Sequence, residues 1–128
     1  MRPLQSFHIC LIGQKLIYDL PLIRKLVSRN NVTLIDRENL TAADAILNSV
    51  NVVLLDCYNS NNIESEILPQ VAKLKKDFAC IFVIVLNGGL SVEQIAMVFK
   101  AGANDYFAEP YDLDMIVERA EFFASRSR

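Results

Sequence analysis

Asn51-Val-Val-Leu-Leu-Asp56 is the stretch that decides the fold, because four consecutive apolar residues are closed by a carboxylate. A continuous apolar run without polar alternation is typical of a parallel strand that is covered on both faces. A carboxylate at the carboxyl end of such a strand lies where open α/β folds place their functional sites. Asp56 is therefore the first candidate site residue.

Further apolar runs share this pattern. Strands are expected at residues 7–12, 32–35, 52–55 and 80–86, with a shorter fifth strand at 105–108. Between them lie helical patterns with predicted N-terminal caps at Asp19, Ser91 and Asp112 and over Thr41-Ala-Ala-Asp44. The helix expected over 63–77 contains Pro69, which predicts a kink or a delayed start. The alternation predicts an α/β fold with a doubly wound parallel sheet and helices on both faces.

Composition bounds the class of protein. The chain has 128 residues, 52% of them apolar, and a formal net charge of −2, which suits one domain with a real core. No basic block indicates nucleic-acid binding, no apolar run is long enough to span a bilayer, and no signal peptide is evident. The widely spaced Cys10, Cys57 and Cys80 favour reduced, buried thiols in a cytoplasm over a disulfide framework or a zinc site.

Two later stretches carry a family pattern together with Asp56. They are Val83-Ile-Val-Leu-Asn87-Gly and Ala101-Gly-Ala-Asn-Asp-Tyr106-Phe-Ala-Glu109-Pro110. With these motifs the chain resembles the receiver domain of bacterial two-component response regulators over nearly its whole length. The resemblance implies a flavodoxin-like (CheY-like) sheet of five parallel strands in the order 2-1-3-4-5 with five helices. It also implies a single domain, 1–128, that forms the N-terminal regulatory part of a longer protein.

The resemblance assigns roles to individual positions. Asp56 corresponds to the phosphoacceptor, Tyr106 to the switch aromatic, and Asn87 to the Ser or Thr that ends the fourth strand. The acidic pair that helps hold Mg²⁺ after the first strand is replaced by Gly13 and Gln14. The family Lys is replaced by Glu109, while the following Pro110 is kept, and the resemblance implies a cis peptide bond before this proline.

These replacements change the expected chemistry. Mg²⁺ prefers carboxylate ligands, and neither Gly13 nor Gln14 supplies one, so metal binding is expected to be weak or absent. A carboxylate at Glu109 would repel a phosphoryl group by roughly 4 kcal/mol at about 4 Å and an effective dielectric near 20. We therefore predict a phosphorylation-deficient pseudo-receiver that is not an enzyme and needs no cofactor. Alternatively, Asp56 and Glu109 converge to recruit a cation, or Glu109 points into solvent.

The surface gives the expected partners. Receiver domains commonly pair through the fourth helix, fifth strand and fifth helix, here approximately 91–101, 105–107 and 112–126. Charged residues on this face could pair across a two-fold axis, among them Lys100, Asp105, Glu118 and Arg119. We expect a homodimer that controls an attached DNA-binding transcriptional output domain, with no direct nucleic-acid or membrane contact by this segment.

Other interpretations stay open. The chain could be a conventional phosphorylated receiver with relaxed requirements, or a small flavodoxin-like enzyme, although the loop 13–18 lacks a phosphate cradle. Asp56 could simply cap the following loop, and Tyr106 could be a half-buried strand aromatic without a switching role. We expect Cys57 to be a packed thiol, His8 to be structural, and three lysines to form a solvated helix end: Lys73, Lys75 and Lys76.

Overall fold

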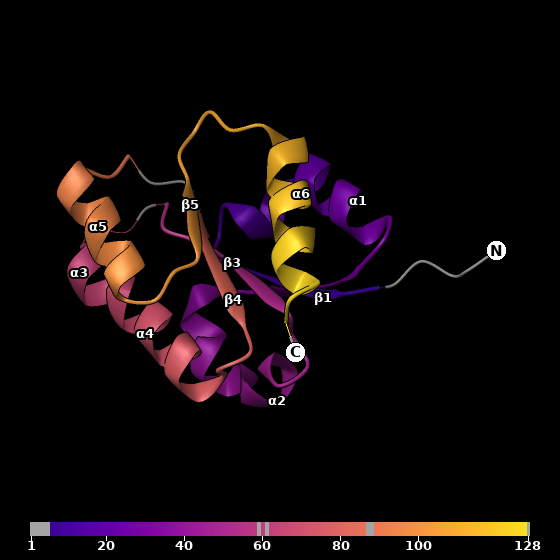
Figure 1. Cartoon of the computed structure of the whole chain (residues 1–128), viewed down its shortest axis with the longest axis horizontal. Helices are drawn as coiled ribbons and strands as arrows, with labels where there is room; N and C mark the ends of the chain where they lie inside the picture. The colour runs from indigo at the N-terminus through magenta and orange to yellow at the C-terminus, as the bar shows by residue number, and fades with distance from the viewer. Residues whose placement is uncertain (1–5, 59, 61, 87–88, 128) are drawn as a thin grey trace.

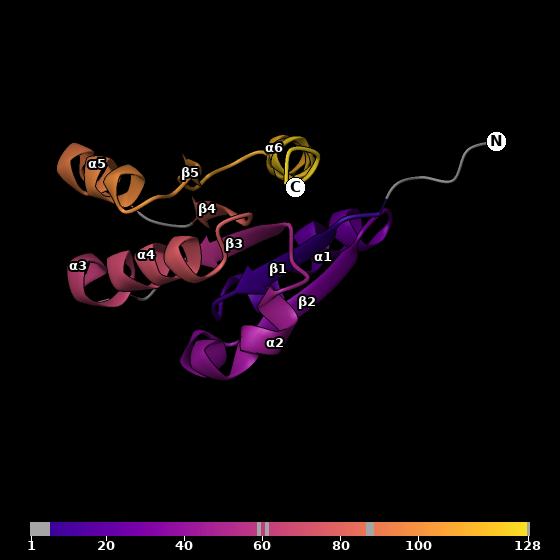
Figure 2. The same ribbon diagram turned by 60° about the horizontal axis from the view of Figure 1, so that its bottom comes forward.

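A five-stranded parallel sheet forms the centre of the computed structural model (Figure 1), which describes residues 6–58, 60, 62–86 and 89–127. The strands lie in the order β2-β1-β3-β4-β5, as predicted. Their bounds are β1 (His8–Ile12), β2 (Asn31–Ile35), β3 (Val52–Asp56), β4 (Phe82–Leu86) and β5 (Asp105–Phe107). Figure 2 shows the strands succeeding one another from β2 to β5 as a twisted layer.

Helices connect consecutive strands. The α-helices are α1 (Leu20–Val27), α2 (Asp44–Leu47), α3 (Ile63–Glu66), α4 (Leu68–Asp77), α5 (Val92–Lys100) and α6 (Leu113–Ala124). Two 3-10 helices, η1 (Leu16–Tyr18) and η2 (Arg37–Ala43), precede α1 and α2. The pairs η2–α2 and α3–α4 each form one connection, so four helical connections join the five strands and α6 follows β5 as the fifth helical segment of a flavodoxin-like, CheY-like fold.

The sheet separates two apolar cores. Alternate residues of each strand point to opposite faces, so Cys10 and Ile12 enter one core while Ile9 and Leu11 enter the other. The first core lies under α2 to α5, and the second lies under α1 and α6, which pack side by side (Figure 1). Because both faces are covered, β3 is buried along its whole length.

Most of the predicted helix signals are confirmed. Asp19 accepts a hydrogen bond from the Leu22 amide, Asp112 caps α6, and Ser91 forms a capping box with Gln94. Gly102 follows α5 with a φ of 123°, a left-handed value that favours glycine at a helix stop. Pro69 stands in the first turn of α4 after a break at Ile67, which confirms the delayed start.

Two local predictions were wrong. The helical stretch before β3 begins at Arg37 rather than at Thr41, because Asp36 accepts a hydrogen bond from the Glu38 amide and caps η2. Cys80 was expected in a buried strand, but β4 begins at Phe82 and Cys80 is exposed in the preceding turn. The other two thiols, Cys10 and Cys57, are buried as expected.

Within the described part of the chain, none of the helices has the length and apolar character needed to cross a membrane.

Candidate functional site

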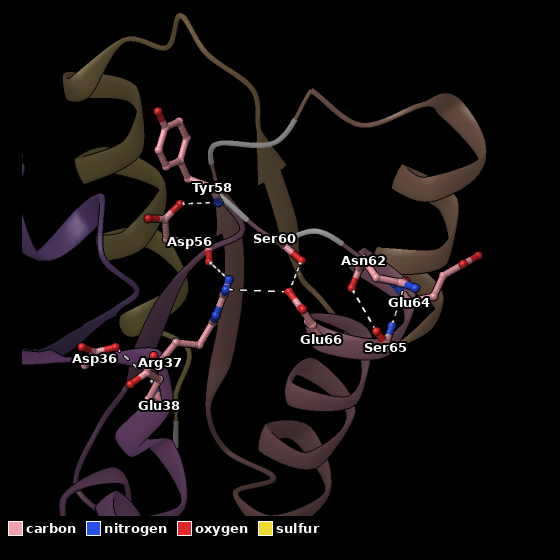
Figure 3. A network of polar contacts seen from close by, with 10 residues as sticks. All are labelled: Asp36, Arg37, Glu38, Asp56, Tyr58, Ser60, Asn62, Glu64, Ser65 and Glu66. Carbon is pink, nitrogen blue, oxygen red and sulfur yellow. Dashed lines mark hydrogen bonds and ion pairs between the residues drawn. The ribbon is translucent and has the colours of Figure 1, made fainter.

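The carboxylate of Asp56 is held by the backbone of two loops. Asp56 ends β3 and is only 1% exposed. Its Oδ2 accepts hydrogen bonds from the amides of Lys15 (2.7 Å) and Leu16 (3.2 Å), and its Oδ1 accepts one from the amide of Tyr58 (2.8 Å; Figure 3). Three donors therefore fix the orientation of both carboxylate oxygens.

Gly13 lets the loop after β1 pass directly over Asp56. A Cβ at position 13 would lie 2.4 Å from the Cβ of Asp56, and the φ of Gly13 is 122°. Both observations require glycine here. The next residue, Gln14, is exposed, so neither position of the predicted degenerate pair supplies a carboxylate at the end of β3.

Glu109 is paired rather than isolated. Its Oε2 lies 2.7 Å from Nζ of Lys15, and the two side chains are 42% and 35% exposed. The hydrogen bond that the Lys15 ammonium group donates to Glu109 raises the pKa of Lys15, against the opposing effect of burial. The Lys15 ammonium also lies 4.3 Å from the centre of the Tyr58 ring. The predicted cis peptide bond between Glu109 and Pro110 is present.

Arg37 closes the other side of the Asp56 loop. Its Nη1 donates to the main-chain oxygen of Asp56 (3.2 Å), and its Nη2 lies 3.9 Å from Oε1 of Glu66 (Figure 3). Ser60 donates to the same Glu66 oxygen (2.8 Å). This network ties the start of η2 to α3 across the carboxyl end of β3.

Lys15 and Arg37 were missed by the sequence analysis. Lys15 directly follows Gly13 and Gln14, the positions that lack the acidic pair, and Glu109 stands where a lysine was expected. These two charges together were the available signal that Lys15 could pair with Glu109. Arg37 follows an ordinary apolar strand, and nothing in its local sequence distinguishes it from a solvated arginine.

Tyr106 lies partly buried on β5 against the first core. Its hydroxyl accepts a hydrogen bond from the Leu90 amide at 3.4 Å, and burial raises its pKa. Both the switch interpretation and the purely structural one are compatible with this inward position. The neighbouring switch position, Asn87, and the following Gly88 lie outside the described residues.

The expected solvated lysine cluster was wrong for one member. Lys75 is partly buried and donates to the main-chain oxygen of Ile81 (2.7 Å) and to Oδ1 of Asn104 (3.1 Å). Burial lowers the pKa of Lys75. Lys73 pairs with Asp77 on the exposed side of α4.

The charged face predicted for pairing is partly used within the chain. Arg119 of α6 forms an ion pair with Asp105 of β5. Lys100 and Glu118 are exposed. Large apolar side chains also stand exposed on the two helices, namely Val92 and Phe99 on α5 and Met115 and Phe122 on α6.

The remaining candidates are structural. Cys57 donates to the Leu86 oxygen (3.1 Å), and burial raises the pKa of this thiol to about 11, so it is packed as predicted. His8 hydrogen-bonds to Ser49 (3.1 Å) and Thr33 (2.7 Å), joining the starts of β1 and β2 to the residues after α2. The Cys57 and His8 side chains make none of the described hydrogen bonds to Asp56.

Two shallow hollows flank the end of β3. One, of about 390 Å³, is lined by Gln14, Lys15, Tyr18, Asp19 and Tyr58. The other, of about 160 Å³, is lined by Gln14, Asp36, Arg37, Glu38 and Tyr58. They mark the point between β1 and β3 where the strand order reverses, which is where folds of this class bind ligands.

Solved structures match all or nearly all of the chain. A protein described as pilus assembly-related, from Burkholderia pseudomallei K96243, matches with a TM-score of 0.79 and 14% identity over 100% of this chain and 96% of its own. The BeF₃-activated DrrB receiver domain matches with a TM-score of 0.79 and 21% identity over 95% of this chain and 100% of its own. This chain has the receiver-domain fold.

A third structural neighbour concerns the chemistry of the site. A response regulator from Burkholderia pseudomallei, solved with a phosphorylated aspartic acid, a calcium ion and citrate, matches the receiver fold with a TM-score of 0.72 and 21% identity. The match covers 94% of this chain and 70% of that one. No family model and no curated protein matches the sequence.

The receiver fold implies a divalent cation beside the aspartate, but the residues present here do not fit one. The Asp56 oxygens already accept backbone hydrogen bonds, and position 13 has no room for a side chain that could bind a metal. The Glu109 carboxylate is already paired with the ammonium group of Lys15. Among the described residues, no three of the His, Cys, Asp or Glu side chains are grouped so that they could hold a metal. The predicted Asp56–Glu109 cation pair is therefore not supported.

Proposed function

We propose that this chain is the receiver domain of a response regulator and that it signals through protein contacts, without phosphorylation of Asp56. The proposal rests on the interactions of the Asp56 and Glu109 carboxylates. The Asp56 oxygens are turned toward three backbone donors, and the Glu109 carboxylate in the loop after β5 is paired with Lys15. Such a domain is a binding module with a pseudo-receiver site and not an enzyme.

The phosphorylation test uses acetyl phosphate with Mg²⁺. The intact mass of the protein is expected to stay unchanged, because the developing charge on a transferred phosphoryl group has no metal to offset it. The Asp56→Asn variant is the matched control for labelling elsewhere in the chain. A stable mass gain in the parent protein that is absent from Asp56→Asn would instead identify a conventional phosphorylated receiver with relaxed requirements.

The proposed contact surface is the face formed by α5, β5 and α6, and its occupant is a second copy of the chain. Val92 and Phe99 are 80% and 43% exposed, and Met115 and Phe122 are 49% and 47% exposed. Exposed apolar side chains on the two helices that flank β5 favour burial against a partner. The exposed Lys100 and Glu118 have opposite charges, so a two-fold axis can bring each against the other. The Asp105–Arg119 pair would support this face from within.

The surface is tested by the oligomeric state in light scattering. We expect Phe99→Glu and Phe122→Glu each to shift a dimer toward monomer. Ile46→Glu is the control, because Ile46 is an exposed apolar residue (42%) on α2, away from this face. Lys100→Glu should weaken the dimer, and adding Glu118→Lys should restore it. A dimer unaffected by the changes at Phe99 and Phe122 would exclude this surface.

The class of output domain is proposed from the receiver fold. We infer that the domain acts in the cytoplasm and controls an attached transcriptional domain that binds DNA. The coding sequence downstream of Arg128 tests this directly, since a DNA-binding motif there is expected. An output of another class would leave the receiver role intact and change the process that it regulates.

A further inference from the structure

The loops after β1 and β5 carry charges opposite to those that the receiver fold implies. A receiver has acidic residues after the first strand and a lysine before the proline after the fifth. Here Lys15 follows Gly13 and Gln14 after β1, and Glu109 precedes Pro110 after β5. Nζ of Lys15 lies 2.7 Å from Oε2 of Glu109. The two loops are therefore joined by an ion pair, with the positive charge on the loop after β1 and the negative charge on the loop after β5.

Lys15 lies in the loop after β1 and contacts the loops after β3 and β5. Its backbone amide donates to Asp56 Oδ2 at 2.7 Å, which fixes the residue against the end of β3. Its ammonium group reaches Glu109 in the loop after β5 and lies over the ring of Tyr58 in the loop after β3. An aromatic face and a carboxylate are the groups that stabilise an ammonium ion.

We infer that the ammonium group of Lys15 takes the place of the metal ion that does not fit this site. The cation belongs to the chain, and it holds the loops after β1, β3 and β5 in one arrangement without metal or phosphate. This inference rests on the proposed phosphorylation-independent function and names the group that makes it possible. Lys15 is a positioning residue, because it acts on the loops and on no reacting atom.

The contribution of the Lys15–Glu109 ion pair to loop stability depends on how firmly Lys15 is held in place. An ion pair between exposed side chains usually contributes little, because ordering two long side chains costs entropy. The main chain of Lys15 is already fixed by Asp56, and the Tyr58 ring adds a second contact for the ammonium group. We therefore expect loss of the Lys15–Glu109 pair to increase the equilibrium constant for opening of the attached loops by about five-fold, which is at the upper end for exposed ion pairs.

Hydrogen exchange measures that opening. In Lys15→Met the amides of residues 57, 58 and 60 and those of 106–109, 111 and 112 are expected to exchange about five-fold faster than in the parent protein. Glu109→Gln should act similarly on 106–112, and the double variant should add little, because both changes remove one interaction. Lys15→Arg should restore slow exchange, since an arginine supplies the same charge to the carboxylate and the ring.

The control is Lys25→Met, which removes another lysine from an exposed ion pair, the one with Asp114 (2.8 Å) between α1 and α6. It should leave both segments unchanged. The inference is overturned if Lys15→Met exchanges like the parent protein, if Lys15→Arg behaves like Lys15→Met, or if 10 mM MgCl₂ slows exchange in the parent. Phosphorylation of Asp56 in the parent would overturn the proposed function as well, whereas unchanged exchange without phosphorylation overturns the role of Lys15 alone.

Discussion

Gly13 and Asp56 are in contact across the ends of β1 and β3, with no room between them for a side chain. A Cβ on Gly13 would lie 2.4 Å from the Cβ of Asp56, at a φ of 122° that other residues rarely adopt. Gly13→Ala should therefore lower the free energy of unfolding by about 2 kcal/mol. Urea denaturation checks this value, with Gly89→Ala as the control because a Cβ at Gly89 meets nothing within 4 Å. Equal losses in both variants would contradict the close approach.

The Asp56 carboxylate supports the fold whether or not it has a reactive role. Asp56→Ala leaves the amides of Lys15, Leu16 and Tyr58 without their acceptor, and the buried one, that of Leu16, costs about 1–3 kcal/mol when it is unpaired. Asp56→Asn keeps one acceptor oxygen and should lose less. Thermal and urea unfolding of the two variants measure the difference. An Asp56→Ala protein as stable as its parent would show that these hydrogen bonds are easily replaced by water.

The three thiols should differ sharply in reactivity. Burial raises the pKa of Cys10 to about 12 and that of Cys57 to about 11, so neither forms appreciable thiolate near pH 8. Cys80 is exposed. A thiol reagent at pH 8 should therefore modify one cysteine quickly in the folded protein, and Cys80→Ser should abolish this fast phase. Full reaction of all three is expected only after unfolding, and a second fast thiol would contradict the packing.

Lys75 gives a pH dependence with a definite sign. Burial lowers its pKa below the ordinary value of 10.5, so in the window between the two values the unfolded chain binds more protons than the folded one. Its contribution to stability therefore rises as the pH rises through that window. The buried thiols act in the opposite direction above their ordinary value of 9.0, so the comparison must be with Lys75→Met.

Urea unfolding of the parent protein and of Lys75→Met at pH 7, 9 and 10.5 isolates the lysine. The stability difference between them should shift in favour of the parent as the pH increases. A difference that stays constant would mean that Lys75 keeps its ordinary pKa, with its ammonium group hydrated beside Asn104.

Local sequence patterns predicted the frame of this molecule well. Apolar runs located the strands, and the caps at Asp19, Ser91 and Asp112 were recognisable because each depends on residues three or fewer positions away. The position of Asp56 at the end of β3 followed from the same logic. Thr41 misled because it also matches a capping pattern, whereas Asp36 caps the segment earlier.

The partners within the site were not predictable in the same way. Lys15 meets Glu109 across 94 positions of sequence, and Arg37 meets the Asp56 oxygen across 19. A single sequence records no such pairing, since each residue alone is indistinguishable from a solvated charge. Lys75 illustrates the same limit, because its burial comes from the turn before β4 and from Asn104, not from its own helix.

The exchange of charge between Lys15 and Glu109 constrains how such a site can arise. Lys15 opposite the lysine that the receiver fold implies at position 109 would place like charges at short range once the acidic pair at 13 and 14 is lost, and Glu109 opposite a retained acidic pair would do the same. The two replacements are thus expected to travel together through a lineage. A basic residue after the first strand combined with an acidic one before the cis proline is a paired signature with which to search genomes for other chains of this fold that have the same two charges.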